Sequence, residues 1–409
     1  MYLVIFMNRQ ILHIDVNNAF LSWTAIDMLN KGYKEDIRTI PAVIGGDESR
    51  RAGIVLAKST LAKEFGIVTG ETIYSARKKC PNVQVFPTNF KIYMEYSNKL
   101  YNLLTEYTDI IERFSVDECF LDMTHFLQND TLLDKAKEIS KRVKNELGFT
   151  VNIGVAHNKV LAKMASDFTK PDRIHTLFEA EIPTKLWPLP VGELFMIGRK
   201  SVPKLNRMGI KTIGDLARTD ENTIIKNFGK HGCIMWEYAN GIDNSEVHYK
   251  QELPKCVGNS VTLPRDVSDI QKLEEILLSL SEHVTYRLRK YGLLANVVNV
   301  QIRSNSFKDR SHQGKLDTAT CSTKIIYNKA KELLEELHRG EEIRLVGLRV
   351  DNLTEKQEEQ ITFFSNQNIE KQEKLDAILD KLKNKYGYSS ISRAGKMNVE
   401  EIVKYKKEN

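Results

Sequence analysis

Three carboxylates in this 409-residue sequence lie where an apolar side chain would be expected. Asp15 interrupts the alternating apolar stretch QILHIDV, and Asp117 and Glu118 are neighbours in the stretch SVDE. A single acid at the end of a strand is usually solvated, so only the three together suggest a site. Carboxylates held close to one another oppose ionisation unless cations neutralise them, and their oxygens are ligands that suit Mg²⁺. If folding brings these side chains together, two Mg²⁺ ions there could activate a hydroxyl group and steady a triphosphate.

Neighbouring strands of one sheet are the elements that would bring the carboxylates together. Alternation and β-branched residues predict a buried strand at 10–16 and a helix after it at 17–30. Two short apolar runs, 111–118 and 119–124, predict a hairpin with Asp117 and Glu118 at or near its turn. Apolar periodicity predicts further elements: helices at 93–111, 135–147 and 160–168, and a strand at 151–157. The pattern is βα(ββ)αβα with antiparallel pairing, an α+β sheet covered by helices.

The rest of the chain divides into three further regions. Residues 41–57 predict two short strands around a polar turn, typical of a small inserted subdomain. A compact helical segment follows the first domain and extends to about Gly241. Residues 256–350 predict strand, helix, two strands, helix and strand, a separate βαββαβ domain. The tail from Thr354 is rich in Gln, Lys and Glu, with a helical stretch at 369–386.

Composition excludes several classes of protein. Hydrophobic residues make up 41% and charged residues 28%, close to globular averages, which excludes a disordered, collagen-like or membrane-spanning chain. The net charge of +6 fits a protein that binds a polyanion without proving one. The five cysteines are scattered with no C-x-x-C pair, which indicates neither a zinc site nor a disulfide framework. The first ten residues lack the features of a signal peptide, so we expect a soluble, cytoplasmic protein that starts at Met1 or Met7.

Three stretches resemble signature motifs of the Y-family translesion DNA polymerases, the bacterial DinB and UmuC group. They are HIDVNNAF at 13–20, SVDECFLD at 115–122 and GVAHNKVLAKMASDFTKP at 154–171, and their order and spacing also match. The resemblance covers roughly 8–350 and implies a right-hand polymerase with palm, small fingers, helical thumb and a βαββαβ little finger. The implied boundaries are palm 1–20 and 87–178, fingers 21–86, thumb with a helix-hairpin-helix 179–250, little finger 255–352 and tail 353–409.

The resemblance also implies roles for residues of the first two motifs. Asp15, Asp117 and Glu118 would be catalytic and would bind two Mg²⁺ ions, with the backbone carbonyl of Val16 also reaching a metal. Phe20 falls where the family places its steric gate, an aromatic ring under the sugar that excludes a 2′-hydroxyl. Without the motif, Phe20 would be interpreted as a core position of a helix. The floor of the nucleotide pocket would be formed by the residues beside it, Asn17, Asn18 and Ala19.

The triphosphate contacts that the resemblance implies depart from the family's usual pattern. The fingers commonly supply a Tyr and an Arg, whereas the stretch KSTLAKEFG supplies Thr60 and Lys63 at those positions. Lys170 keeps the contact from the palm. A lysine is a point charge and cannot replace the bidentate arginine fork, so we expect weaker geometric control over the phosphates. Each lysine alone would be interpreted as a solvated surface charge.

Two groups of cations predict contacts with a DNA backbone. Residues 199–211 carry five cations, including Arg199, Lys200 and Lys204, and no acid. They lie in a helix-hairpin-helix pattern, whose backbone N–H groups can face phosphates, although a solvated helix face is the alternative. In the βαββαβ domain, a net charge of +6 between 283 and 316 predicts one basic sheet face laid along a duplex. The contacts expected from that face are Arg287, Arg303 and Arg310.

Two adjacent aromatics, Phe363 and Phe364, lie in a polar tail that offers them no core of its own. With Gln360 they resemble the short peptide by which bacterial polymerases hold the sliding clamp, in which the aromatics fill a pocket. The alternative is that both rings pack back onto the preceding domain.

The sequence therefore predicts a low-fidelity, template-directed DNA polymerase of the DNA-damage or SOS response, which extends primers across damaged DNA. The resemblance implies primer-template DNA, deoxynucleoside triphosphates and the sliding clamp as partners, and leaves open whether accessory subunits are needed. One alternative is a non-catalytic DNA-binding accessory protein of the DNA-damage response. Another is a different two-metal nucleotidyl transferase, because Gly45-Gly46-Asp47-Glu48 resembles a diguanylate cyclase signature. The presence of all three carboxylates and the basic C-terminal domain favour the polymerase.

Overall fold

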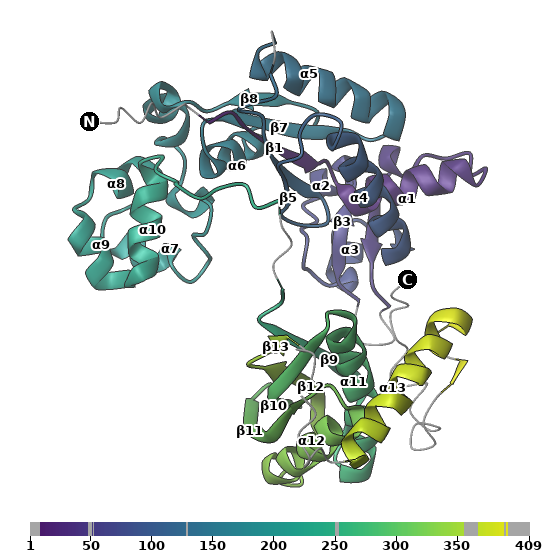
Figure 1. Ribbon diagram of the computed structural model, residues 1–409. Coiled ribbons are helices and arrows are strands. Elements are labelled where there is room, and N and C mark those ends of the chain that lie inside the picture. Colours follow the sequence, from purple (N-terminus) through teal and green to yellow (C-terminus); the bar gives the residue numbers. More distant parts are fainter. Residues whose placement is uncertain are drawn as a thin grey trace. The chain divides into compact units, whose positions relative to one another are not determined.

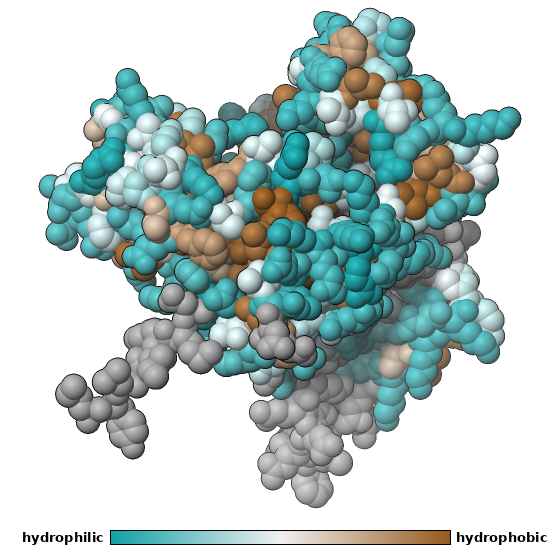
Figure 2. All heavy atoms as spheres, turned by 90° about the horizontal axis from the view of Figure 1, so that it is seen from above, coloured by the Kyte–Doolittle hydropathy of each residue, from teal (hydrophilic) through white to brown (hydrophobic). Residues whose placement is uncertain are grey.

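The structure, a computed structural model, describes residues 9–47, 51, 53–127, 130–249, 253–355, 367–387 and 390–391 (Figure 1). The chain divides into two compact units, Met1–Gly45 with Val55–Gln251, and Gly46–Ile54 with Glu252–Asn409. Hydrophilic side chains cover much of the face seen in Figure 2, with apolar residues gathered in smaller groups among them. Of the helices in the described ranges, none is long and apolar enough to cross a membrane.

The first unit is built around a five-stranded sheet in the order β5-β6-β1-β7-β8. The strands are β1 Ile11–Val16, β5 Ile111–Arg113, β6 Glu118–Asp122, β7 Val151–Ala156 and β8 Ile174–Thr176 (Figure 1). β1 lies at the centre and runs antiparallel to both β6 and β7. The predicted strands and hairpin are confirmed. β8, which pairs parallel to β7, was not predicted because three residues are too few to show an alternating pattern.

Helices cover both faces of this sheet. On one face, Leu12 and Ile14 of β1 share a core with the helices α1 Ala19–Asn30, α4 Phe90–Leu104 and α5 Leu132–Arg142, the last continued by a π-helical turn, η3 Val143–Leu147. On the other face, Ile11 packs with α6 Lys159–Asp167. Because side chains of a strand alternate between faces, His13 and Asp15 also lie on the α6 face.

One helix boundary predicted from the sequence is wrong. Apolar residues at helical spacing predicted a helix over 93–111, but α4 ends at Leu104 and Ile111 begins β5. The hydroxyl of Thr108 donates to the backbone carbonyl of Asp122 at 2.8 Å and holds the intervening turn against the sheet. Ile111 is therefore buried as part of a strand.

The predicted inserted subdomain is a small three-stranded sheet in the order β3-β2-β4 with a core of its own. Its elements are β2 Ala42–Gly45, β3 Val55–Lys58, α2 Thr60–Glu64, α3 Ile73–Lys79 and β4 Gln84–Pro87, after a short 3₁₀ turn, η1 Ile37–Thr39. Its buried core includes Val43, Val55 and Ile73. Helix α1 packs instead into the core of the central sheet through Leu21 and Trp23.

The remaining part of the first unit is helical, as predicted. Its elements are the short turns η4 Glu179–Glu181, η5 Ile182–Leu186 and η6 Val191–Glu193, and the helices α7 Val202–Arg207, α8 Ile213–Arg218, α9 Glu221–Phe228 and α10 Lys230–Ala239. Gly232 allows α10 to approach α9 closely, because a Cβ there would lie 2.7 Å from the backbone oxygen of Ile224.

The second unit contains a four-stranded antiparallel sheet in the order β11-β10-β12-β9. Its elements are β9 Cys256–Val267, α11 Ile270–Lys290, β10 Leu293–Ser304, β11 Asp309–Thr320, α12 Thr323–Leu337 and β12 Ile343–Asp351, with a short strand, β13 Thr354–Glu355, paired to β10. The helices α11 and α12 cover one face through residues such as Leu277 and Leu334. The predicted βαββαβ order is confirmed.

The predicted tail helix is confirmed as α13 Gln367–Tyr386. It packs on α11 and α12 through charged side chains. The guanidinium of Arg289 pairs with Asp380 at 2.6 Å, and Asp376 accepts a hydrogen bond from the backbone N–H of Thr323 at 2.9 Å. Arg289 is therefore engaged by the tail.

Candidate active site

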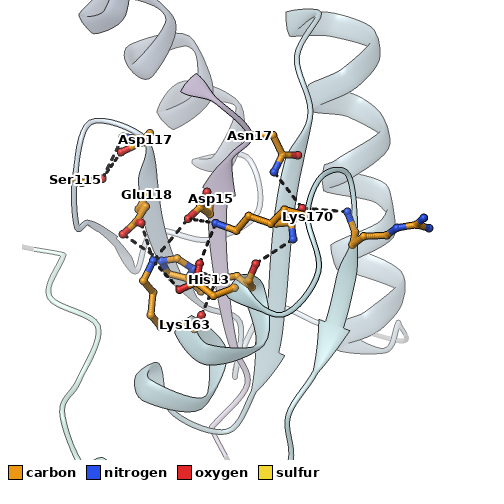
Figure 3. Close-up of polar contacts among 12 residues, drawn as sticks. His13, Asp15, Asn17, Ser115, Asp117, Glu118, Lys163 and Lys170 are labelled. Atoms are coloured by element: carbon orange, nitrogen blue, oxygen red, sulfur yellow. Dashed lines mark hydrogen bonds and ion pairs between the residues drawn. The ribbon is translucent and has the colours of Figure 1, made fainter. Parts of the chain in front are cut away.

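The carboxylates of Asp15 and Glu118 lie side by side on neighbouring strands. Asp15 of β1 is the direct partner of Glu118 of β6 and, on its other side, of Asn152 of β7. Residues that face each other across antiparallel strands point to the same side of a sheet. The three side chains therefore form one row on the face of the sheet that α6 covers, and Figure 3 shows Asp15 and Glu118 of this row.

Lys163 of α6 reaches this row from above the sheet. Its ammonium group lies 2.6 Å from Oε1 of Glu118 and 3.6 Å from Oδ2 of Asp15. Gly154 of β7 makes this approach possible, since a Cβ there would collide with the backbone oxygen of Ala162 in α6. The close contact between α6 and β7 thus places a cation between two carboxylates.

Lys170, which follows α6, supplies a second cation. Its Nζ lies 3.0 Å from Oδ2 of Asp15 and 2.9 Å from Oδ1 of Asp167. Figure 3 shows Lys170 and Lys163 extending toward Asp15 and Glu118 from different directions. One helix and the loop after it therefore neutralise the acids of two strands.

The two carboxylates differ in their electrostatics. Burial raises the pKa of Asp15 to about 6, although Lys170 and Lys163 oppose the rise. Burial acts in the same direction on Glu118, but contacts with His13 and Lys163 outweigh it and lower the pKa of Glu118 to about 2. Burial also lowers the pKa of His13, which favours a neutral ring whose Nδ1 lies 2.7 Å from the Ser166 hydroxyl. Glu118 is thus ionised, and additional positive charge would stabilise the ionised form of Asp15 most.

Asp117 lies on the turn before β6 and is oriented differently. Its carboxylate accepts a hydrogen bond from the Ser115 hydroxyl at 2.6 Å, and its backbone oxygen accepts from the N–H of Val16 at 3.1 Å. The predicted acids are therefore neighbours in the fold. In the part of the chain that the structure describes, however, no three His, Cys, Asp or Glu side chains are already arranged as a metal-binding group.

The predicted nucleotide-binding residues fall into different environments. Phe20 is half-buried and stacks on Tyr93, with ring centroids 4.4 Å apart. Asn18 precedes α1 in a left-handed conformation and is exposed, while Ala19 is buried. Asn17 is 5% exposed, and its side chain faces Asn152.

The other two predicted triphosphate contacts, Thr60 and Lys63, are exposed on α2. Within the described residues, neither contacts the carboxylates. The predicted clamp-binding residues Gln360, Phe363 and Phe364 lie outside the described residues.

The predicted cations of the helical segment differ in their exposure and contacts. Arg199 and Lys200 are exposed on the turn before α7. Lys204 lies 4.5 Å above the ring of Phe228 and donates to the backbone oxygen of Asn227.

The three cations expected on one sheet face of the second unit, Arg287, Arg303 and Arg310, do not share a face. Arg303 lies on the open face of the sheet and pairs with Asp309 at 2.7 Å. Arg310 faces Ile302 on the helix-covered side and pairs with Glu341, and Arg287 of α11 donates to the backbone oxygen of Gly258 at 3.1 Å. A charge count along the chain cannot show on which side of a strand each cation lies.

The open face of that sheet instead carries a shallow polar groove. It is lined by Gly258, Asn259, Ser260, Asn299, Gln301, Gly347, Leu348 and Arg349. Arg349 was missed because it lies outside the stretch 283–316 whose charge was counted.

Sequence reasoning also missed Lys163, His13 and Asn152. Lys163 lies within the quoted third motif, between the apolar residues Leu161 and Met164 of an amphipathic helix. A lysine on the buried side of a helix is unusual, and that signal could have identified it.

The fold of this chain is that of a Y-family DNA polymerase. The chain is similar to a solved Y-family DNA polymerase chimera, Dbh-Dpo4(243-245)-Dbh, with a TM-score of 0.74 and 25% identity, over 85% of this chain and 100% of that one. It belongs to the impB/mucB/samB family, whose models match residues 14–167, residues 254–363 for the C-terminal domain, and residues 179–210 for the HHH motif.

Curated relatives cover nearly the whole chain. DNA polymerase IV of Clostridium acetobutylicum is 47% identical over 97% of this chain and 100% of its own length. DNA polymerase IV of Acetivibrio thermocellus is 37% identical over 95% of this chain and 97% of its own. DNA polymerase IV 1 of Bacillus subtilis is 34% identical over 96% of this chain and 94% of its own.

Replacing Asp15 with Asn should stabilise the metal-free protein at neutral pH. The pKa of Asp15 rises from 3.8 to about 6 on folding, so the folded state disfavours the ionised carboxylate. Ionisation of Asp15 therefore lowers the free energy of unfolding fully above pH 6 and not at all below about pH 4. We expect Asp15→Asn to raise the free energy of unfolding by on the order of 1–3 kcal/mol at pH 7.5. Urea unfolding in a metal chelator measures it. The matched control is Asp117→Asn, because Asp117 lies on a less buried turn. Its free energy of unfolding should change little. A loss of stability in Asp15→Asn would contradict the assigned burial cost.

Proposed function

We propose that this chain is a low-fidelity, template-directed DNA polymerase that extends primers across damaged DNA by nucleotidyl transfer. The observation that carries the proposal is the pairing of Asp15 with Glu118 on adjacent strands, in a chain that is similar over its length to polymerases of this family. The alternative of a non-catalytic accessory protein is not favoured, because relatives similar over nearly the whole chain are DNA polymerases and the three proposed catalytic acids are all present.

The donor set fits two Mg²⁺ ions. Asp15, Asp117 and Glu118 offer carboxylate oxygens, and Val16 offers a backbone carbonyl beside them. The raised pKa of Asp15 and the ammonium groups around it indicate a site that already requires compensating positive charge. When bound, the ions would activate the primer hydroxyl and stabilise charge on the triphosphate.

The chain's own cations would then bind the triphosphate. Lys170 lies closest to the carboxylates, so we assign it the phosphate contact from the palm, which it would make by leaving Asp15 as metal charge arrives. Thr60 and Lys63 are exposed on α2 and would contribute from the fingers. A lysine binds phosphate without the bidentate geometry of an arginine, so these contacts would orient the triphosphate less strictly.

The domain roles follow the boundaries proposed from the sequence: palm 1–20 and 87–178, fingers 21–86, thumb 179–250 and little finger 255–352. We assign sequence-independent contacts with the DNA backbone to the exposed Arg199 and Lys200 of the thumb. The open face of the second unit's sheet would add Arg303 and Arg349. Arg310 is left out because it lies on the helix-covered side.

Binding of a sliding clamp through Gln360, Phe363 and Phe364 remains part of the proposal on sequence grounds alone. The same holds for a cytoplasmic location and for expression in the SOS response.

Replacing Asp117 with Ala should abolish primer extension without weakening DNA binding. Loss of one metal ligand removes stabilisation from the transition state, and we expect extension to slow by at least about 100-fold. Affinity for primer-template should stay within about threefold because its phosphate contacts lie elsewhere. Single-nucleotide insertion and fluorescence anisotropy measure the two quantities. Asp130→Ala, an exposed acid paired with Lys135, is the control. Extension by Asp117→Ala at the wild-type rate would refute the assignment.

Replacing Phe20 with Ala should relax selection against ribonucleotides. If the ring lies under the sugar, its removal makes room for a 2′-hydroxyl, and the ratio of ribonucleotide to deoxynucleotide incorporation should rise at least about tenfold. Phe90→Ala removes a neighbouring half-buried ring from α4 and should leave that ratio unchanged. Equal ratios in wild type and Phe20→Ala would show that the ring only packs against Tyr93.

A further inference from the structure

A buried pair of amides connects the metal-site strand to the loop that carries Lys170. Asn17, directly after β1, is 5% exposed, and Asn152 of β7 is 0% exposed. The side-chain N–H of Asn17 donates to Oδ1 of Asn152 at 3.1 Å. Two uncharged amides are costly to bury unless their hydrogen bonds are made, so their remaining partners decide what the pair does.

Those partners lie on both sides of Lys170. The amide nitrogen of Asn152 donates to the backbone oxygens of Ser166 at 3.0 Å and of Thr169 at 2.8 Å. Beyond Lys170, the backbone N–H of Arg173 donates to Oδ1 of Asn152 at 3.2 Å. One side chain thus binds the backbone immediately before and shortly after the lysine.

Asn17 completes the network from the other strand. Its Oδ1 accepts the backbone N–H of Asp172 at 2.8 Å and the hydroxyl of Thr150 at 2.9 Å. Both lone pairs of each amide oxygen and both N–H groups of Asn152 are therefore used. A buried network in which these groups are paired is rigid and favours one arrangement of the loop.

The loop needs this support. Asp172 has a φ of 58°, in the left-handed region that costs energy for a residue with a Cβ and persists only when its surroundings hold it. Its backbone N–H is bonded to Asn17, and its carboxylate pairs with Lys144 at 2.7 Å. These two contacts fix the backbone conformation of Asp172, two positions after Lys170.

We propose that the Asn17–Asn152 pair is a positioning device for Lys170, and through it for the triphosphate of the incoming nucleotide. This inference rests on the phosphate contact assigned to Lys170 above. It changes the role of Asn17, which acts through the loop rather than as the floor of the nucleotide pocket. Neither amide is a catalytic residue.

The test compares Asn152→Leu, Lys170→Met and the double variant, using single-turnover insertion at varied deoxynucleotide concentration on the full-length protein. We expect Asn152→Leu to raise the apparent Kd for the nucleotide about tenfold, with a smaller effect on the maximal rate. Lys170→Met should raise the apparent Kd for the nucleotide at least as much. The double variant should show the same Kd as Lys170→Met alone, because both changes remove the same contact. Affinity for primer-template should not change.

The matched control is Thr108→Val, which removes a buried hydrogen bond to Asp122 in the same unit. It should lower stability without changing the nucleotide Kd, and the same pattern in Asn152→Leu would overturn the inference. Should Asn152→Leu fail to fold, Asn17→Ala replaces it, with the same expectation. Additive effects in the double variant would also overturn the inference, because Asn152 would then act by another route. An unchanged Kd in Lys170→Met would instead overturn the phosphate role of Lys170, and the inference with it.

Discussion

Two like charges on neighbouring strands are the constraint on which the first unit depends. Register places Asp15 opposite Glu118, and both face the same side of the sheet. Such a pair is unstable in a buried site unless positive charge is delivered to it. Helix α6 and the loop after it deliver that charge as Lys163 and Lys170. The absence of a side chain at Gly154 lets the helix come close enough to do so.

The same constraint explains why this arrangement suits catalysis but does not maximise stability. Lys163, 2.6 Å from Glu118, holds Glu118 ionised, whereas burial raises the pKa of Asp15 despite two nearby lysines. In the proposed function, divalent ions would supply the positive charge that Asp15 still lacks, and Lys170 would then be available to contact phosphate. Strain and buried charge concentrate at functional sites because function, not stability, selects them there.

Much of this could be predicted from the residues. Apolar alternation located β1 and β7, and an acid within an alternating strand identified Asp15, because the pattern that forms a strand also exposes an exception to it. Lys163 and Asn152 could not be assigned roles, since their partners come from other strands and depend on register. The sequence also could not predict the face on which Arg310 lies, because a shift of one residue in register moves a side chain to the opposite face of the sheet. The row Glu118, Asp15, Asn152 exists only after three strands have paired.

The central claim is that Lys163 and Glu118 stabilise each other in the metal-free protein. A double-mutant cycle of Lys163→Met and Glu118→Gln, followed by urea unfolding in a chelator at pH 7.5, measures their coupling directly. The three tryptophans all lie in the first unit, so their fluorescence reports on its unfolding. We expect a coupling of at least about 1 kcal/mol for this buried pair, and about 0–0.5 kcal/mol for the exposed pair Lys137 and Asp134. Additive single effects at Lys163 and Glu118 would contradict the account.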